Sequence, residues 1–105
     1  MIVDKIGLPA VLEQCGEECC ELGAASLKMA RKIRGENPTP KSFEEIRLNL
    51  IDEIADVTLC MAILKYEAGI TTDEITHAIM ERKEQRWNDR IEQAAKEAGE
   101  TNELS

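Results

Sequence analysis

The sequence is poor in aromatic residues, with one Phe, one Trp and one Tyr among 105 residues. Sandwiches and barrels draw on aromatic and β-branched side chains, so this scarcity disfavours an all-β fold. Hydrophobic residues still make up 43% of the chain and charged residues 32%, which is normal for a folded domain. Aliphatic side chains must build the core. We therefore expect one all-α domain over residues 1–105, with its core between about residues 8 and 98.

Long apolar runs and an excess of basic residues are also lacking. No run reaches the roughly 18 apolar residues that a membrane-spanning helix needs, and Met1–Lys5 have no long apolar stretch of the signal-peptide type. The net charge is −8, whereas binding to nucleic-acid phosphates needs local Lys and Arg. We therefore expect neither a membrane nor a nucleic acid as a partner. An acidic protein that binds a phosphorylated ligand needs a metal to do so.

The cysteines do not form a zinc motif. Cys15, Cys19, Cys20 and Cys60 contain no C-x-x-C pair and no Cys/His cluster. We interpret them as reduced thiols that serve as small apolar side chains. Because reduced thiols are typical of the cytosol, we expect a cytoplasmic protein.

Proline and glycine mark the ends of the first expected helix and the loop after it. A helix over about residues 8–34 can accept Pro9 in its first turn and end at Gly35. The stretch Gly35–Lys41 contains two prolines, Pro38 and Pro40, which cannot continue a helix. We therefore predict a loop there.

Capping patterns begin the two remaining helices. Ser42 and Glu45 have the spacing of a capping box, and a second helix is expected from there to about residue 68. Thr71 and Glu74 repeat the pattern before a third helix that we expect to end near residue 98, followed by a frayed tail over residues 100–105. The first two helices are expected to form an antiparallel hairpin, to which the third is added.

The second helix is apolar on nearly every side between Leu48 and Leu64. A helix of this kind is buried, and two neighbouring helices of one chain do not cover its whole circumference. We therefore expect a second subunit to complete a helical bundle, in a homodimer or a homotetramer.

The only charged residues in that apolar stretch are Asp52, Glu53 and Asp56, and all are acidic. Burying unpaired carboxylates costs roughly several kcal/mol of folding free energy or forces the carboxylates to be protonated. A hard cation with oxygen ligands removes this cost. On the first helix Glu18 and Glu21 are three residues apart and share a face, as Glu53 and Asp56 do. In an antiparallel hairpin the two pairs lie at nearly the same level, so we predict a metal site between them. The alternative is a pair of solvated acidic faces.

These residues resemble a known family. The stretch from Glu17 to Ala25 (EECCELGAA) and the stretch from Glu53 to Val57 (EIADV) look like the signature of MazG-like nucleoside triphosphate pyrophosphohydrolases. Lys28 with Arg31, the loop that follows Gly35, and the stretch from Lys83 to Arg90 are also similar to small members of the family.

The resemblance implies an activity and a role for each residue. A nucleoside triphosphate, ribo- or deoxyribo-, would be cleaved to the monophosphate and pyrophosphate, as in housecleaning of the nucleotide pool. Mg²⁺, with Mn²⁺ as the alternative, would be held by Glu18, Glu21, Glu53 and Asp56, and Glu17 or Glu21 would accept the proton of the attacking water. The substrate phosphates would be bound by Lys28, Lys83, Arg86 and Arg90, unless the last three are instead paired with acidic side chains.

Two other readings stay open at this point. A non-catalytic helical oligomerisation or adaptor protein could carry the acidic faces incidentally, and it would release no pyrophosphate from any nucleotide. A di-iron carboxylate bundle fits poorly, because it needs two E-x-x-H motifs and the chain has a single His, His77, which can complete only one, with Glu74.

Overall fold

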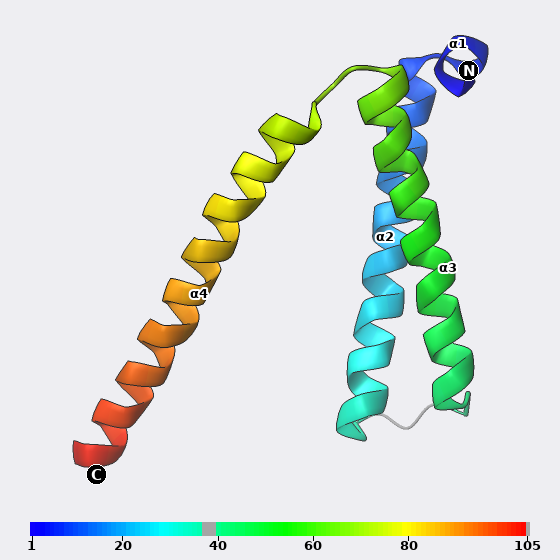
Figure 1. The fold of residues 1–105 in the computed structure, drawn as a ribbon. Coiled ribbons are helices and arrows are strands. Elements are labelled where there is room, and N and C mark those ends of the chain that lie inside the picture. The colour runs from blue at the N-terminus through cyan, green and yellow to red at the C-terminus, as the bar shows by residue number, and fades with distance from the viewer. Residues whose placement is uncertain (37–39, 105) are drawn as a thin grey trace. The chain divides into compact units, whose positions relative to one another are not determined.

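The computed structural model describes residues 1–36 and 40–104, and side chains as far as Glu100. Helices are the only regular secondary structure among these residues, which confirms the predicted all-α class for the described part of the chain (Figure 1). The elements are, in order, α1 (Ile2–Ile6), α2 (Leu8–Arg34), α3 (Phe43–Ala62), the π-helical turn η1 (Ile63–Glu67) and α4 (Asp73–Leu104). By their internal contacts they divide into two units, Met1–Ile70 and Thr71–Ser105.

The first unit is built on a hairpin of α2 and α3, which lie side by side and run in opposite directions (Figure 1). As predicted, α2 begins at Leu8 and ends before Gly35, whose positive φ of 72° lets its N–H and that of Glu36 bond back to the last turn. The N-cap Ser42 also behaves as predicted, since its Oγ accepts from the Glu45 N–H at 3.2 Å. Pro38, in the predicted loop, lies outside the described residues.

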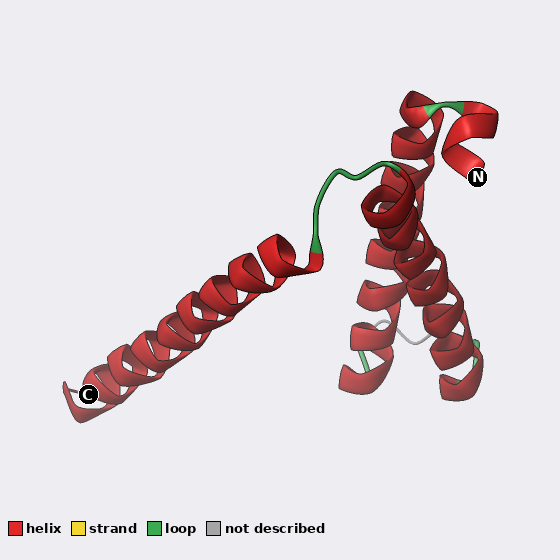
Figure 2. Cartoon of the chain, turned by 45° about the horizontal axis from the view of Figure 1, so that its top comes forward, coloured by secondary structure: helices red, strands yellow, loops and turns green. Residues whose placement is uncertain are grey.

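Two short elements at one end of the hairpin were not predicted. The five residues of α1 are too few for a helix to be recognised by periodicity, and Gly7 separates them from α2. The expected second helix does reach Glu67, but its last five residues form η1, with the Ala68 N–H bonded to the Ile63 carbonyl at 3.1 Å. In Figure 2, α1 lies beside the start of α2.

The second unit is α4, and two predictions about its ends were wrong. Its first turn is capped by Thr72, not Thr71, because the Ile75 N–H donates to Thr72 Oγ1 at 3.3 Å. The helix also passes through Gly99 to Leu104, so the frayed tail is not seen over residues 100–104. Gly99 does not take the positive φ that ends a helix, and a glycine within a helix costs only about 1 kcal/mol.

The core of the first unit is small and lies near α1. It consists of Val11 and Cys15 from α2 with Cys60 and Ile63 from the end of α3 and η1, and Val3 and Leu64 pack against it. Cys15 and Cys60 are buried free thiols, as expected of small apolar side chains, whereas Cys19 and Cys20 are exposed. Within the described part of the chain, no helix has the length and apolar character needed to cross a membrane.

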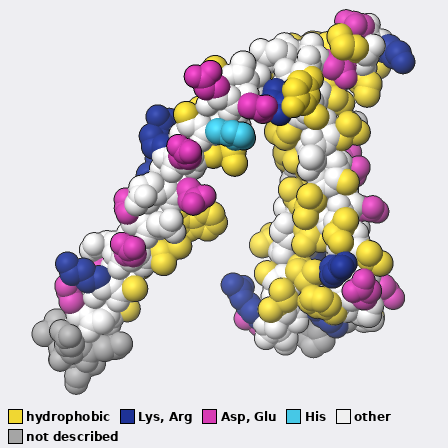
Figure 3. All heavy atoms as spheres, viewed as in Figure 1, with side chains coloured by type: hydrophobic (Ala, Val, Ile, Leu, Met, Phe, Trp, Pro, Cys, Tyr) yellow, Lys and Arg dark blue, Asp and Glu magenta, His cyan; other side chains and the backbone are white. Residues whose placement is uncertain are grey.

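Burial of α3 is incomplete within the single chain. Leu48, Ile51 and Leu59 are 54%, 46% and 57% exposed, although α2 packs along the helix. Hydrophobic side chains accordingly show on the surface of the hairpin (Figure 3). The chain's own helices thus leave part of α3 uncovered, as expected, and whether a second subunit covers it stays a prediction.

Candidate metal centre

Four carboxylates converge between α2 and α3. Glu18 and Glu21 come from α2, and Glu53 and Asp56 come from α3. One oxygen from each of the four lies within 4.8 Å of one oxygen from each of the others. The pairs therefore face each other at one level of the hairpin, as their spacing predicted.

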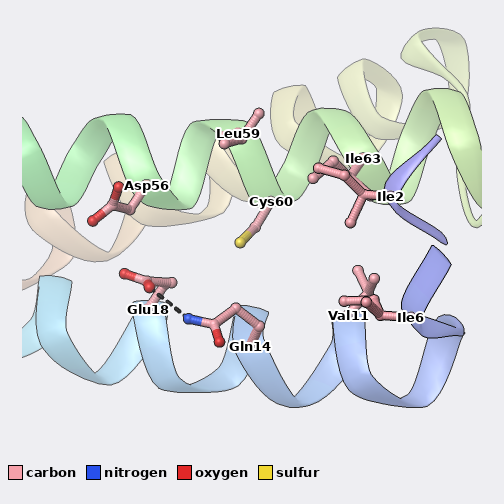
Figure 4. A pocket seen from close by; sticks show the side chains of 9 residues that line it. All are labelled: Ile2, Ile6, Val11, Gln14, Glu18, Asp56, Leu59, Cys60 and Ile63. Atoms are coloured by element: carbon pink, nitrogen blue, oxygen red, sulfur yellow. Dashed lines mark hydrogen bonds between the residues drawn. The ribbon is translucent and has the colours of Figure 1, made fainter.

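A contact between two buried cysteines joins the same two helices one turn away from these carboxylates. The Cys60 thiol is hydrogen-bonded to the Cys15 thiol, across the two helices. Cys15 precedes Glu18 by three residues, and Cys60 follows Asp56 by four. Residues three and four apart lie on the same helical face, so the packed cysteines bring Glu18 and Asp56 opposite each other (Figure 4).

Two of the four carboxylates have a buried oxygen that finds no hydrogen-bond partner in the described part of the chain. Glu18 and Glu53 are half-buried, and their Oε2 atoms are buried without a hydrogen-bond partner among the described residues. Glu18 Oε1 accepts from the Gln14 amide at 2.7 Å. No ion pair within 4.0 Å joins any of the four to a basic group in residues 1–36 or 40–100. An unpaired buried carboxylate oxygen is costly, and a cation at this point would remove the cost.

The donor set indicates the type of cation. All four groups are carboxylates, and neither a thiol nor an imidazole belongs to the cluster. Oxygen ligands suit hard divalent ions, whereas thiol and imidazole ligands select zinc or copper. The acidic cluster could thus hold a divalent ion of the Mg²⁺, Mn²⁺ or Ca²⁺ type.

A cavity of about 190 Å³ opens beside the cluster. Figure 4 shows the carboxylates of Glu18 and Asp56 turned toward each other at one end, and aliphatic side chains at the other. The apolar part of the lining comes from α1, α2, the end of α3 and η1: Ile2, Ile6, Val11, Leu59, Cys60 and Ile63. A ligand here would meet acidic groups, or a cation held by them, at one end and an apolar wall at the other.

The environment of Cys60 in that wall makes its thiol reluctant to ionise. Burial in the apolar core raises the pKa of Cys60 from 9.0 to about 11, with a further contribution from its hydrogen bond to Cys15 and from the charge of Glu18. Cys60 therefore serves as a neutral apolar group at physiological pH.

The remaining residues with predicted roles lie outside the carboxylate cluster. Glu17 is exposed on α2, directly before Glu18. Lys28 is half-buried on the same helix, seven residues after Glu21 and therefore roughly 10 Å further along the axis on the same side.

The basic residues Lys83, Arg86 and Arg90 all belong to α4 in the second unit, where they are exposed. No ion pair of theirs with an acidic side chain is found among the described side chains, so the alternative of ion pairing gains no support.

The structure adds lining residues that sequence reasoning missed. Gln14 could have been found, because it stands four residues before Glu18 on the same face. Ile2 and Ile6 carried no usable signal, since their role depends on how α1 packs.

Comparison of the chain with protein-family models, with curated proteins and with solved structures finds no match.

Proposed function

We propose that the protein is a Mg²⁺-dependent nucleoside triphosphate pyrophosphohydrolase that releases a nucleoside monophosphate and pyrophosphate. The observation that carries the proposal is the meeting of four carboxylates from two helices within 4.8 Å, two of them with a buried oxygen that has no hydrogen-bond partner in the described part of the chain. The resemblance of the same residues to the MazG-like signature supports the choice of reaction. Mn²⁺ is the alternative ion.

Different carboxylates of the chain would bind the metal and accept the proton. Glu18, Glu21, Glu53 and Asp56 would hold the ion, which when bound supplies charge neutralisation for phosphate oxygens and a more acidic water. The proton of the attacking water would pass to a carboxylate that is not fully engaged as a ligand. Glu17 is exposed beside the cluster and does not belong to it, so its carboxylate would be free for this role. Glu21 is the alternative.

The cavity suggests how the substrate would lie. Its phosphates would be drawn to the acidic end, where the cation is held, and its less polar nucleoside would face the apolar wall. Lys28, Lys83, Arg86 and Arg90 would neutralise the remaining phosphate charge.

We further propose that the chain assembles as a homodimer or a homotetramer through α3. Leu48, Ile51 and Ile54 are each about half exposed, at 54%, 46% and 47%. Pairing with another copy would remove this apolar surface from water, and closed two-fold symmetry is the commonest arrangement.

The decisive experiment measures pyrophosphate release from a panel of ribo- and deoxyribonucleoside triphosphates. We expect Mg²⁺-dependent turnover of at least one, which EDTA stops and excess Mg²⁺ restores. Glu53→Gln should abolish it. Asp52→Asn is the matched control, because it removes one negative charge from the adjacent exposed position on α3 and leaves the cluster intact. No release from any nucleotide would favour the adaptor protein instead.

A further inference from the structure

The short helix α1 forms one wall of the cavity beside the carboxylates. Ile2 and Ile6 line the cavity, whereas Val3 packs against the buried core. Ile2 and Ile6 remain 40% and 56% exposed, so they stand at the edge of the cavity, between its interior and the solvent (Figure 4). The position of α1 therefore determines how wide the cavity is and how a ligand reaches it.

A helix of five residues does not hold this position by itself. Isolated helices shorter than about 12 residues are marginal in water. The structure provides one polar tie from α1 to a distant part of the chain, in which the Val3 N–H donates to Glu67 Oε1 at 3.1 Å, across 64 residues of sequence. Glu67 is half-buried and is the last residue of η1, four residues after the cavity residue Ile63.

The connection between α1 and α2 consists of a single residue that can act as a hinge. Gly7 has φ +88° and ψ 153°, a conformation that residues with a Cβ avoid. It ends α1, where its N–H bonds to the Val3 carbonyl at 2.8 Å, and it begins α2, where its carbonyl accepts from the Val11 N–H at 3.3 Å. A change of backbone angles at Gly7 would swing α1 without disturbing the rest of α2.

We propose that α1 is a hinged wall of the cavity and that Glu67 is the positioning residue that latches it shut. With the latch closed, Ile2 and Ile6 enclose the apolar end of the cavity. With it open, the cavity admits its ligand past α1. That the ligand is the nucleoside part of a nucleotide rests on the proposed function, whereas the latch itself does not.

Cys60 provides a test that needs no enzyme activity, because its thiol lies in the cavity wall behind α1. In a Cys19→Ser/Cys20→Ser background, labelling of Cys60 by methyl methanethiosulfonate would be followed by peptide mass mapping, which separates it from Cys15. Glu67→Leu keeps side-chain volume but cannot accept the Val3 N–H, so we expect labelling roughly 3- to 10-fold faster, the factor that loss of one hydrogen bond predicts. Glu67→Gln keeps an accepting oxygen and should stay within about 2-fold of the parent.

These measurements test the latch separately from the proposed enzyme activity. Equal Cys60 labelling in Glu67→Leu and Glu67→Gln, with unchanged far-ultraviolet circular dichroism, would overturn the latch. Should Glu67→Leu fail to fold, amide exchange of the Val3 N–H in the unsubstituted protein decides: protection supports the tie, and exchange at the rate of a free peptide overturns it. If a nucleotide is hydrolysed, Glu67→Leu should raise KM with little change in kcat, and Glu67→Gln should restore KM. Absence of hydrolysis would count against the proposed enzyme while the labelling result still decides the latch.

Discussion

Replacing Glu53 by glutamine should make the metal-free protein more stable and the Mg²⁺-loaded protein less stable than the parent. In the absence of a cation, Glu53 lies within 4.8 Å of three other carboxylates, and its buried Oε2 has no hydrogen-bond partner among the described residues. The amide of glutamine keeps the shape of the side chain and removes the negative charge. With a cation bound, the same substitution removes one ligand.

The size of the effect follows from the separation of the charges. Two unit charges at 4.8 Å repel by about 0.9 kcal/mol in bulk water and by about 3.5 kcal/mol at an effective dielectric constant of 20. Because Glu21 and Asp56 are exposed, the lower value is the better guide for the pairs they form with Glu53. Relief of two or three repulsions at this lower value amounts to about 2–3 kcal/mol. For a domain of this size, each kcal/mol shifts Tm by about 4–8 °C.

The assay is thermal unfolding followed by circular dichroism, first in EDTA and then at increasing Mg²⁺ concentration. Glu53→Gln should have the higher Tm in EDTA, and the parent should gain Tm with Mg²⁺ while the variant gains little. Asp52→Asn, which removes a charge outside the cluster, should respond to Mg²⁺ as the parent does. A Tm for Glu53→Gln in EDTA below that of the parent would refute the electrostatic reasoning. An equal gain with Mg²⁺ in parent and variant would refute Glu53 as a ligand in the metal site.

Three other outcomes follow from the structure. The raised pKa of Cys60 contributes to the free energy of unfolding, because the folded protein holds the thiol proton more tightly than the unfolded chain does. This stabilisation is present in full below pH 9 and is lost as the pH rises through about 11. Urea unfolding should show a loss of about 2–3 kcal/mol over this range, and Cys60→Ala should not show it. Arg86→Ala and Lys83→Ala should raise KM for the nucleotide several-fold while leaving Mg²⁺ affinity within about 2-fold, and unchanged KM and kcat in both would confine these residues to a structural role. Light scattering at micromolar concentration should show a dimer or a tetramer, and a folded species near 11.7 kDa would contradict assembly through α3.

The sequence predicted those parts of the structure that depend on local spacing. Glu18 and Glu21, like Glu53 and Asp56, are three residues apart, and counting from the turn between their helices was enough to place the pairs at one level. Gly35 and Ser42 marked helix ends because each acts on its own neighbours. Local signals failed where two alternative structures differ little in free energy. Either Thr71 or Thr72 could cap α4, and the helix could either end at Gly99 or continue through it.

The cavity could not be predicted because it depends on contacts between distant segments. Ile2 and Ile6 reach it only because α1 folds back over the hairpin, and Glu67 meets the Val3 N–H across 64 residues. The π-helical turn that ends in Glu67 has no marker in the sequence that distinguishes it from a continued α-helix. The role of the basic residues of α4 and the assembly through α3 stay predictions.

All four carboxylates come from the interior of helices, and none comes from the chain that joins α2 to α3. Among the described residues of the connection between the helices, Gly35, Glu36 and residues 40–42, none contributes a ligand to the cluster. In general, doubling the length of a chain segment that joins two fixed ends costs only about 0.6 kcal/mol of loop-closure entropy. Related sequences could thus lengthen, shorten or replace this connection over evolutionary time while keeping the same four ligands in register. A search for such sequences should weigh the two acidic pairs heavily and leave the distance between them free.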